Sequence, residues 1–265
     1  MILKPQKTVK IGNKLFNIKL NILYDGSFFE GFQKQKKRIT VQGELEKALL
    51  KIYKKPVKVI GSSRTDSGAH AISHTVNYKT DIFIPESGLI TAINSYSHKG
   101  LSALSAEYIS PEFHSRHDAV SRLYRYHIYI ADIPVPFLEN YALYQKNELD
   151  LNLMKEAGNY LIGKHNFSQF QVNDTTVAVR NMFDFDINTE KIKMHWGKAL
   201  EFIILTYRAD SFLRGMIRKI TGTLIKVGEG KISLKEFKDL VDNKKDVRSG
   251  NVVTASGLYL VRTEY

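Results

Sequence analysis

Apolar and polar residues alternate along residues 16–24. Every second side chain from Phe16 to Tyr24 is hydrophobic, and Asn17, Lys19 and Asn21 lie between them. Because successive side chains of a strand point to opposite faces, this pattern predicts a strand with one buried face. The turn signal Asp25-Gly26-Ser27 follows it directly.

The spacing changes to that of a helix after Thr40, which can cap a helix that ends before Pro56. The apolar stripe of this helix consists of Val41, Leu45, Leu49 and Ile52. Short strands are predicted over 57–60 and 74–79, on either side of a polar loop over 61–70.

The later part of the chain mixes strands and helices in a similar way. Alternation predicts strands over 123–130, 177–187, 200–207 and 257–262. A helix capped by Asp150 is predicted over 150–161. A second helix is predicted from Asp210 or Ser211, and its apolar stripe consists of Phe212, Met216, Ile220, Leu224 and Val227. The spacing of Leu234, Phe237 and Val241 predicts a third, short helix. In the helix predicted from Asp210 or Ser211, Arg214 and Arg218 would lie one turn apart.

Intermixed strands and helices with antiparallel pairing predict an α+β fold in two similar halves. The loop near Asp132-Ile-Pro-Val-Pro136 is the one convincing boundary, so the halves are expected over 1–131 and 132–265. With 265 residues and 43% apolar side chains, the chain can bury a sizeable core.

The sequence has no cysteine, which excludes disulfides, thiolate nucleophiles, cysteine zinc ribbons and iron–sulfur sites. No apolar run approaches the ~18 residues of a membrane span, and the N-terminus turns polar too soon for a signal peptide. We therefore expect a cytoplasmic enzyme or binding protein.

The formal charge of +12 is unevenly distributed along the chain. Residues 1–79 hold 16 Lys and Arg against 5 Asp and Glu, whereas residues 131–265 hold 19 Lys and Arg against 17 Asp and Glu. The excess positive charge of residues 1–79 favours a polyanionic partner, although a need for solubility alone is an alternative explanation of that charge.

Sequence signals for cofactors are missing. There is no Gly-x-Gly-x-x-Gly, and the pairs His70/His74 and His114/His117 have no flanking ligands to complete a metal site.

The polar loop over 61–70 is more informative, because Arg64 and Asp66 lie two residues apart among small side chains, with Gly68 free to adopt a positive φ. One interpretation is an Asp–Arg pair that braces a turn. The other is a carboxylate that a guanidinium keeps ionised as a base or nucleophile.

Eight motifs in order resemble those of the TruA family of tRNA pseudouridine synthases and extend over nearly the whole chain from about Asn17. They are Tyr24-Asp-Gly-Ser-Phe-Phe-Glu-Gly-Phe-Gln-Lys-Gln35, Thr40-Val-Gln42, Gly61 to Ala71, Phe113-His-Ser-Arg116, Ser121-Arg-Leu-Tyr-Arg-Tyr126, His165-Asn-Phe-Ser168, Ser211 to Gly222 and Ala255-Ser-Gly-Leu-Tyr-Leu260. Each motif alone is weak, but the ordered set is specific.

The resemblance implies a role for each of five residues. Asp66 would be the catalytic aspartate, and Arg218 would pair with it and keep it charged. Tyr124 would stack on the flipped base, Arg64 would hold the loop or a phosphate, and Leu258 would line the uracil pocket. The resemblance also implies a homodimer with no cofactor or metal, a basic cleft around Asp66, and tRNA as substrate, at uridines 38–40 of the anticodon arm.

Simpler interpretations stay open: Tyr124 as a core tyrosine and Arg218 as a solvated helix charge. The chain also departs from the family pattern at Phe32, which replaces a usual Trp, at Ser62-Ser63, at Ala69 and at Asn94–His98. A divergent synthase that acts on another tRNA or rRNA uridine is one alternative. A non-catalytic RNA-binding protein, which would use the basic track of Lys34–Arg38, Lys51, Lys54, Lys55 and Lys58 alone, is another.

Overall fold

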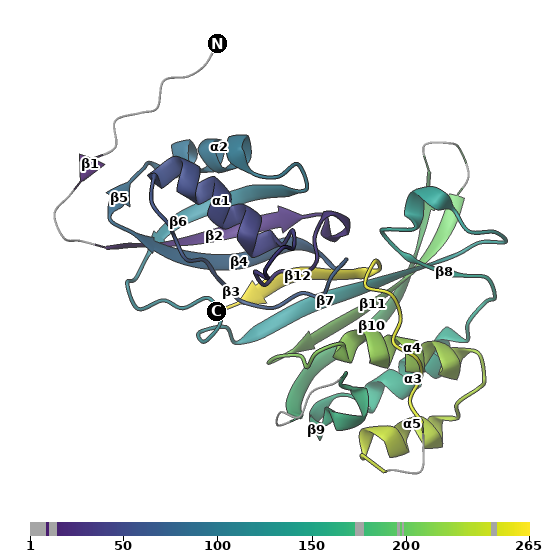
Figure 1. Ribbon diagram of the computed structural model, residues 1–265. Helices are drawn as coiled ribbons and strands as arrows, with labels where there is room; N and C mark the ends of the chain where they lie inside the picture. Colours follow the sequence, from purple (N-terminus) through teal and green to yellow (C-terminus); the bar gives the residue numbers. More distant parts are fainter. Residues whose placement is uncertain (1–8, 11–14, 173–177, 195–196, 198, 245–247) are drawn as a thin grey trace. The chain divides into compact units, whose positions relative to one another are not determined.

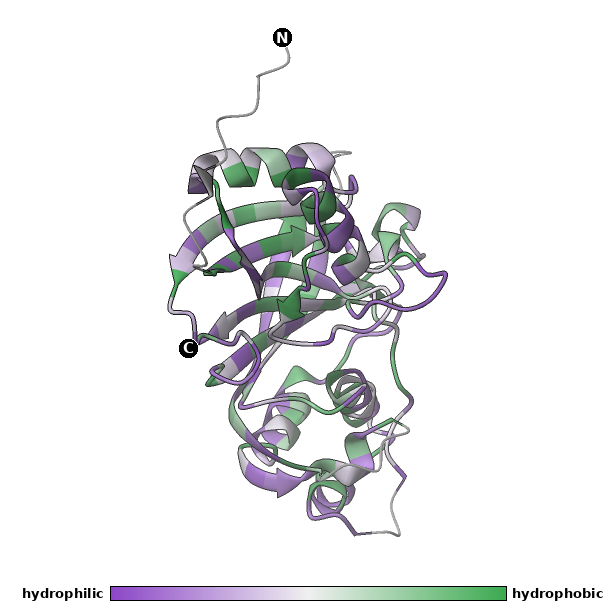
Figure 2. Ribbon diagram, turned by 60° about the vertical axis from the view of Figure 1, so that its left-hand side comes forward, coloured by the Kyte–Doolittle hydropathy of each residue, from purple (hydrophilic) through white to green (hydrophobic). Residues whose placement is uncertain are grey.

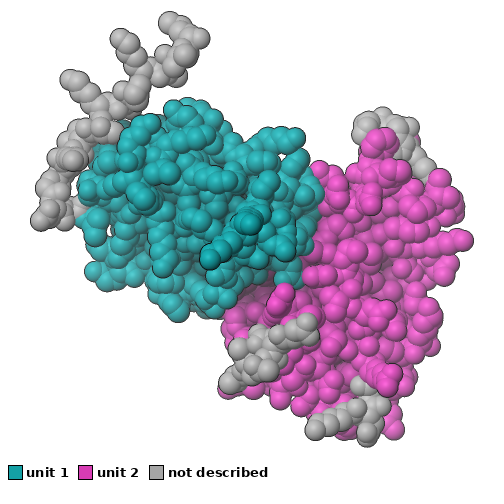
Figure 3. Space-filling view, in the orientation of Figure 1, with its two compact units in different colours: residues 1–120, 260–265 teal, residues 121–259 magenta. Residues whose placement is uncertain are grey.

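The computed structural model describes residues 9–10, 15–172, 178–194, 197, 199–244 and 248–265 (Figure 1). The chain forms two compact units, one of residues Met1–Val120 with Leu260–Tyr265 and one of Ser121–Tyr259 (Figure 3). This division falls eleven residues before the boundary proposed at 131/132, so that the strand predicted over 123–130 opens the second unit.

The first unit is built on the antiparallel strands β6 (Leu101–Ile109), β2 (Phe16–Tyr24) and β4 (His70–Thr80), with β2 in the middle. The strand β12 (Leu258–Glu264) follows β4 in the sheet order, and the short strand β3 (Ile60–Gly61) also pairs with β4. Outside this sheet, β1 (Val9–Lys10) pairs with β5 (Ile82–Phe83). The helices α1 (Val41–Tyr53) and α2 (Glu86–Tyr96) cover one face of the sheet (Figures 1 and 2).

Alternation in β2 places the core of this unit where the sequence predicts it. Ile18, Leu20 and Ile22 are fully buried, as are Leu45 and Leu49 of α1. The prediction that Thr40 caps α1 is confirmed, because its Oγ1 accepts a hydrogen bond from Gly43 N at 3.2 Å. The helix ends at Tyr53, earlier than Pro56 requires, because Lys54 adopts a left-handed conformation with φ of +57°.

The second unit has a sheet in the order β7 (Ser121–Ile130), β11 (Ala199–Ala209), β10 (Val179–Lys193) and β9 (Gly163–Asn166), all antiparallel. The short strand β8 (Leu143–Gln145) runs parallel to β7, which makes the sheet mixed. The helices α3 (Leu151–Asn159), α4 (Met216–Gly228) and α5 (Leu234–Val241) lie together on one side of it (Figure 1). Three 3-10 turns, at Gly26–Phe28, Pro136–Leu138 and Phe167–Phe170, complete the described elements. Both units therefore combine antiparallel sheet with helices, and the α+β class is confirmed.

Several predicted boundaries are wrong. The strand expected over 57–60 is confined to Ile60–Gly61, and β4 begins at His70 instead of His74. The strand expected over 177–187 continues to Lys193, while its first residue, Val177, lies outside the described residues. Two further elements, α2 and β6, were not predicted from the sequence.

The helix expected from Asp210 or Ser211 begins only at Met216. Gly215 precedes it with φ of +67°, a left-handed conformation that interrupts helical backbone. A Cβ at this glycine would lie 2.6 Å from Val172 Cγ2, and Val172 N donates a hydrogen bond to Arg214 O at 3.0 Å. Phe212 and Arg214 therefore belong to a turn that packs on Val172, and Arg214 is not one helical turn from Arg218.

Four buried tyrosines predict how stability depends on pH. Burial raises the pKa of Tyr126 to about 12 and the pKa values of Tyr53, Tyr78 and Tyr207 well above 10.0. Because the folded state holds these protons more tightly than the unfolded state, the stabilisation is complete below about pH 10 and is lost as the pH rises through the folded pKa values. We expect the free energy of unfolding to fall steeply above about pH 10. Tyrosinate absorbance from these four residues should appear together with unfolding, and its appearance in a fully folded chain would contradict this expectation.

Candidate active site

The loop that carries Asp66 connects β3 to β4 and is held by residues 24–32. Phe32 N donates a hydrogen bond to Thr65 O at 3.1 Å, and Gly68 N donates one to Phe29 O at 3.4 Å. Within the loop, Ala69 N donates to Asp66 O at 3.2 Å. The backbone on both sides of Asp66 is therefore tied to a separate segment of the chain, which restricts the positions its carboxylate can take.

Two glycines of this supporting segment allow it to approach the loop closely. A Cβ at Gly26 would lie 2.1 Å from Ala69 O, which no larger residue could tolerate. Gly31 adopts φ of +89°, and a Cβ there would lie 3.1 Å from Thr65 O. Gly68 in the loop itself has φ of +82°, the positive φ that its lack of a side chain allows.

A buried chain of hydrogen bonds braces the first half of the loop. Ser63 N donates to His74 Nε2 at 3.3 Å, His74 Nδ1 lies 3.0 Å from Tyr24 Oη, and Tyr24 Oη lies 2.7 Å from Thr65 Oγ1. Because Nε2 accepts a hydrogen bond, the proton of a neutral imidazole resides on Nδ1. His74 then donates to Tyr24, whose hydroxyl also shares a hydrogen bond with the hydroxyl of Thr65, the neighbour of Asp66.

A second histidine braces the far end of the loop. Gly26 N donates to His70 Nδ1 at 3.0 Å, and Asp25 Oδ1 lies 3.3 Å from the same nitrogen. His70 is 3% exposed and His74 is fully buried, so both act as structural groups. Among the described residues, no group of three or more His, Asp or Glu side chains is arranged to hold a metal ion.

Asp66 is partly exposed between the buried residues Thr65 and Ala69, and Arg64 is exposed. In the part of the chain that the structure describes, Arg64 makes no hydrogen bond or ion pair to Asp66, so the Asp–Arg brace considered from the sequence is not formed. The hydrogen bonds described above brace the loop instead. A partly exposed carboxylate on a fixed loop can act as a nucleophile or a base.

The second unit brings together the elements that carry Tyr124, Arg218 and Leu258. Arg218, in the first turn of α4, donates from Nε to Val253 O at 2.7 Å, a few residues before Leu258. Tyr126 of β7 donates from Oη to Thr254 O at 2.8 Å, which joins β7 to the same segment. Tyr124 and Leu258 are each 6% exposed.

Tyr124 pairs with Tyr207 in the register of β7 and β11. Its ring makes a T-shaped contact with the ring of Phe212, with 5.2 Å between the ring centroids and an angle of 79° between the ring planes. The turn before α4 thus contributes Phe212 to this site, although the sequence placed that residue in a helix stripe. The structure therefore groups Arg64 with Asp66 in the first unit, and the other three predicted residues in the second.

Sequence reasoning missed Tyr126 and the supporting roles of Tyr24, Thr65 and His74. Tyr24 stood in a quoted motif, and the alternation of β7 included Tyr126, but burial and partner atoms cannot be read from a pattern. The pKa of Tyr126 is raised by burial, and the nearby charge of Arg218 lowers it in part. At neutral pH Tyr126 is therefore a neutral hydrogen-bond donor that holds the backbone at Thr254.

Comparison with known proteins identifies the family. A family model described as tRNA pseudouridine synthase matches residues 157–265. The chain is 38% identical over 253 residues to tRNA pseudouridine synthase A 2 of Clostridium perfringens, covering 94% of this chain and 99% of that protein. It is 36% identical to tRNA pseudouridine synthase A of Clostridium acetobutylicum, with 94% and 99% covered, and 35% identical to that of Thermus thermophilus, with 91% and 94% covered.

Two α+β units, one with an aspartate on a braced loop and the other with Tyr124, Arg218 and Leu258, match the class of enzyme to which these relatives belong. Within that class, the chain belongs to the tRNA pseudouridine synthase family, at a similarity that extends over nearly its whole length. Within the described residues, no helix is long and apolar enough to cross a membrane.

We predict that Tyr24→Phe lowers the turnover number as well as stability. The change leaves His74 and Thr65 without their shared partner, which should cost about 1–3 kcal/mol of unfolding free energy and loosen the loop. Tyr53→Phe is the matched control, because Tyr53 Oη is buried at 3.1 Å from Tyr78 Oη in the same unit, away from the loop. Thermal unfolding and single-turnover rates should separate the two variants. Equal turnover in both would show that the Tyr24 hydroxyl is not needed to position Asp66.

Proposed function

We propose that this chain converts uridine to pseudouridine in tRNA, with Asp66 as the catalytic residue and uridines 38–40 of the anticodon stem-loop as its targets. The observation that carries the proposal is the loop around Asp66, which hydrogen bonds hold on both sides within a chain of the tRNA pseudouridine synthase family. Its relatives are named for this activity on tRNA.

The reaction rearranges bonds within one nucleotide. The glycosidic bond from the sugar to uracil N1 breaks, the uracil turns, a new bond forms from the sugar to C5, and the C5 proton leaves while N1 gains one. Atoms and electrons balance without an oxidant, a reductant or an acceptor molecule. Asp66 assists by attacking the sugar or the base, or by removing a proton from the nucleotide.

The other predicted residues have supporting roles in this proposal. Tyr124 stacks on the extracted base and helps to remove its C5 proton, returning part of the stacking energy lost on extraction. Arg218 keeps Asp66 ionised, Arg64 holds the loop or a phosphate, and Leu258 lines the uracil pocket. A half of residues 1–131 would supply Asp66, Arg64 and Tyr124, and a half of 132–265 would supply Arg218 and Leu258, in a cytoplasmic homodimer around a basic cleft.

The basic track expected along Lys34–Arg38 is only partly available to RNA. Lys34 pairs with Glu46 at 2.7 Å, and Arg38 pairs with Glu30. Lys36 and Lys37 are exposed and have no such partner among the described residues. These two lysines would therefore contribute most of the phosphate attraction of this segment, which should weaken with salt.

We predict that Asp66→Asn abolishes pseudouridine formation but leaves tRNA affinity within about threefold, because phosphate contacts dominate the binding energy. Release of tritium from tRNA labelled at uracil C5 measures the reaction, and filter binding measures affinity. Retained turnover in Asp66→Asn would refute the catalytic assignment. An inactive wild-type chain that still binds tRNA would favour the alternative of a non-catalytic RNA-binding protein.

The target position has a separate test. Total RNA from cells that lack this gene should lose pseudouridine at positions 38–40 of tRNA and regain it when the wild-type gene is restored. Loss at another tRNA or rRNA uridine would instead identify a divergent synthase and refute the assignment to the anticodon arm.

A further inference from the structure

Phe212 lies against Tyr124 and has no role in the reaction described so far. It is partly exposed, and its ring meets the Tyr124 ring in the T-shaped contact at 5.2 Å. The last side-chain torsion of a tyrosine has a broad energy minimum, so its ring plane is set by the groups packed around it and not by the backbone. The orientation of Tyr124 therefore depends on where Phe212 is held.

The turn 210–215, which carries Phe212, is fixed at its start to strand β10. Asp210 N donates to Asn181 O at 3.1 Å, and Asn181 N donates to Asp210 Oδ2 at 3.2 Å. Ser211 Oγ donates to Asp210 Oδ1 at 3.3 Å. Both carboxylate oxygens of Asp210 thus accept hydrogen bonds, and the backbone just before Phe212 has a defined position.

The start of the turn is also tied to the strand that carries Tyr124. Arg122 Nη1 donates to Asp210 O at 2.5 Å, and Arg122 is buried. Arg122 and Tyr124 are two residues apart in β7, so they project from the same face of that strand. The turn and β7 are therefore joined twice, by a charge-assisted hydrogen bond at Asp210 and by the ring contact at Phe212.

A different segment holds the end of the turn. Val172 N donates to Arg214 O, and the positive φ of Gly215 lets the turn approach Val172 closely. Leu213 is buried, and its carbonyl oxygen accepts a hydrogen bond from Met216 N at 3.1 Å, which fixes the turn to the first residue of α4. Phe212 therefore lies between two anchored ends, an arrangement that restricts where its ring can move.

We propose that Phe212 is a positioning residue for Tyr124, and that its ring holds the plane of the Tyr124 ring in the orientation that the extracted uracil requires. The inference rests on the proposed function, in which Tyr124 stacks on the base and helps to remove its C5 proton. Small errors in the placement of a reacting group cost large factors in rate. A tyrosine ring without its neighbouring ring would still be present but would be poorly aligned.

The test compares Phe212→Leu, which removes the ring but keeps an apolar side chain, with Phe212→Tyr, which keeps the ring. Phe202→Leu is the matched control, because Phe202 is a buried residue of the same unit whose ring lies 6.1 Å from that of Tyr129, further along β7. Phe212→Leu should lower the turnover number about tenfold. Phe212→Tyr and the control should stay within about threefold of the wild-type chain, and all three variants should bind tRNA within about twofold of it, because phosphate contacts dominate affinity.

Substrate tRNA with deuterium at uracil C5 separates the positioning of Tyr124 from a general loss of structure. The bond from carbon to deuterium breaks more slowly than that to hydrogen, but turnover reports the difference only as far as this step limits the rate. Phe212→Leu should increase the isotope effect on turnover, because removal of the C5 proton becomes slower relative to the other steps. Phe212→Tyr and Phe202→Leu should leave it at the wild-type value.

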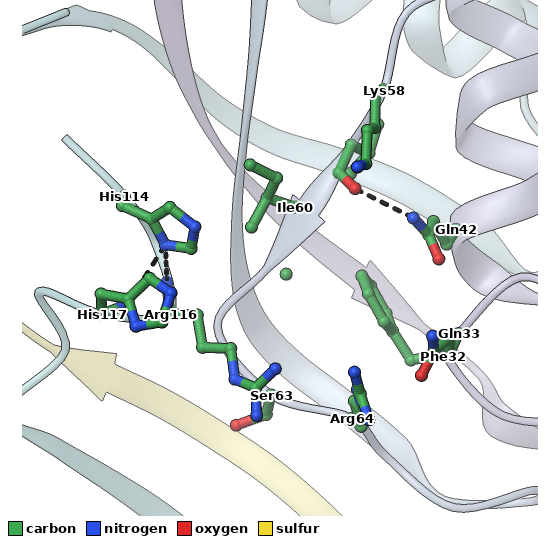
Figure 4. Close-up of a pocket in the computed structure, with 12 residues that line it drawn as sticks. Phe32, Gln33, Gln42, Lys58, Ile60, Ser63, Arg64, His114, Arg116 and His117 are labelled. Atoms are coloured by element: carbon green, nitrogen blue, oxygen red, sulfur yellow. Dashed lines mark hydrogen bonds between the residues drawn. The ribbon is translucent and has the colours of Figure 1, made fainter. Parts of the chain in front are cut away.

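A variant in the first unit shows whether any lost aromatic contact has the same effect. Phe32 lines a cavity of about 320 Å³ together with Ser63 and Arg64 of the Asp66 loop (Figure 4). Its ring lies 4.5 Å from that of His74, so Phe32→Leu should lower turnover through the loop that carries Asp66. It should not increase the C5 isotope effect, and an increase equal to that of Phe212→Leu would overturn the proposal.

The rate at which the Tyr124 ring turns over measures the positioning without RNA or turnover. Nuclear magnetic resonance line shapes of a ring-labelled Tyr124 give this rate in the free protein. Phe212→Leu should raise it about three- to tenfold, the range expected for the loss of one aromatic contact, and Phe212→Tyr should not. An unchanged rate in Phe212→Leu would overturn the proposal. So would a turnover number that stays at or rises above the wild-type value.

Failure of this inference can be told apart from failure of the proposed function. If the wild-type chain forms pseudouridine and Phe212→Leu matches it in turnover and isotope effect, the positioning role is wrong and the proposed function stands. If the wild-type chain forms no pseudouridine, the proposed function fails. The ring rates then still decide whether Phe212 holds Tyr124 in place.

Discussion

The hydroxyl of Tyr24 joins His74 to Thr65, and the position of Asp66 depends on that junction. The imidazole of His74 is fully buried and accepts from Ser63, so one side chain fixes two points of the loop. A carboxylate that must meet a nucleotide extracted from an RNA stem gains from being placed before the substrate arrives, because no ordering cost then opposes binding. The glycines at positions 26 and 31 follow from the same requirement, since they let the supporting segment approach the loop.

In the second unit, side-chain hydrogen bonds likewise hold a backbone segment in place. Two side chains, Arg218 and Tyr126, donate to backbone carbonyls of residues 253 and 254, which fixes the segment leading to Leu258. Gly257 allows that segment to come close to β7, because a Cβ there would lie 2.6 Å from His127 O. In both units, therefore, residues that a motif comparison would assign to chemistry also hold the backbone around the site.

The sequence allowed much of the fold to be predicted because several elements carry a strong local signal. The alternation of 16–24, the Thr40 and Asp150 caps and the apolar stripe ending at Val241 each reflect interactions within one element. The start of α4 was missed because Gly215 takes its conformation from a contact with Val172, more than forty residues away. Asn17 is placed correctly on the polar face of its strand, yet its burial under Ser110 and Phe113 depends on a distant loop. The residues of the candidate site could be named from motifs, whereas the hydrogen bonds that hold them could not, because their partners are far apart in sequence.

The central claim is that the Asp66 loop is already ordered in the free protein by its bonds to residues 24–32 and to His74. Amide hydrogen exchange of the protein without RNA tests it most directly, because Ser63, Gly68 and Ala69 each donate a backbone hydrogen bond in this arrangement. We expect these three amides to exchange much more slowly than an unstructured chain, and Tyr24→Phe to speed the exchange of Ser63 most. Exchange at the unstructured rate in the free protein, with protection only after tRNA is added, would show that the substrate orders the loop and would contradict this account.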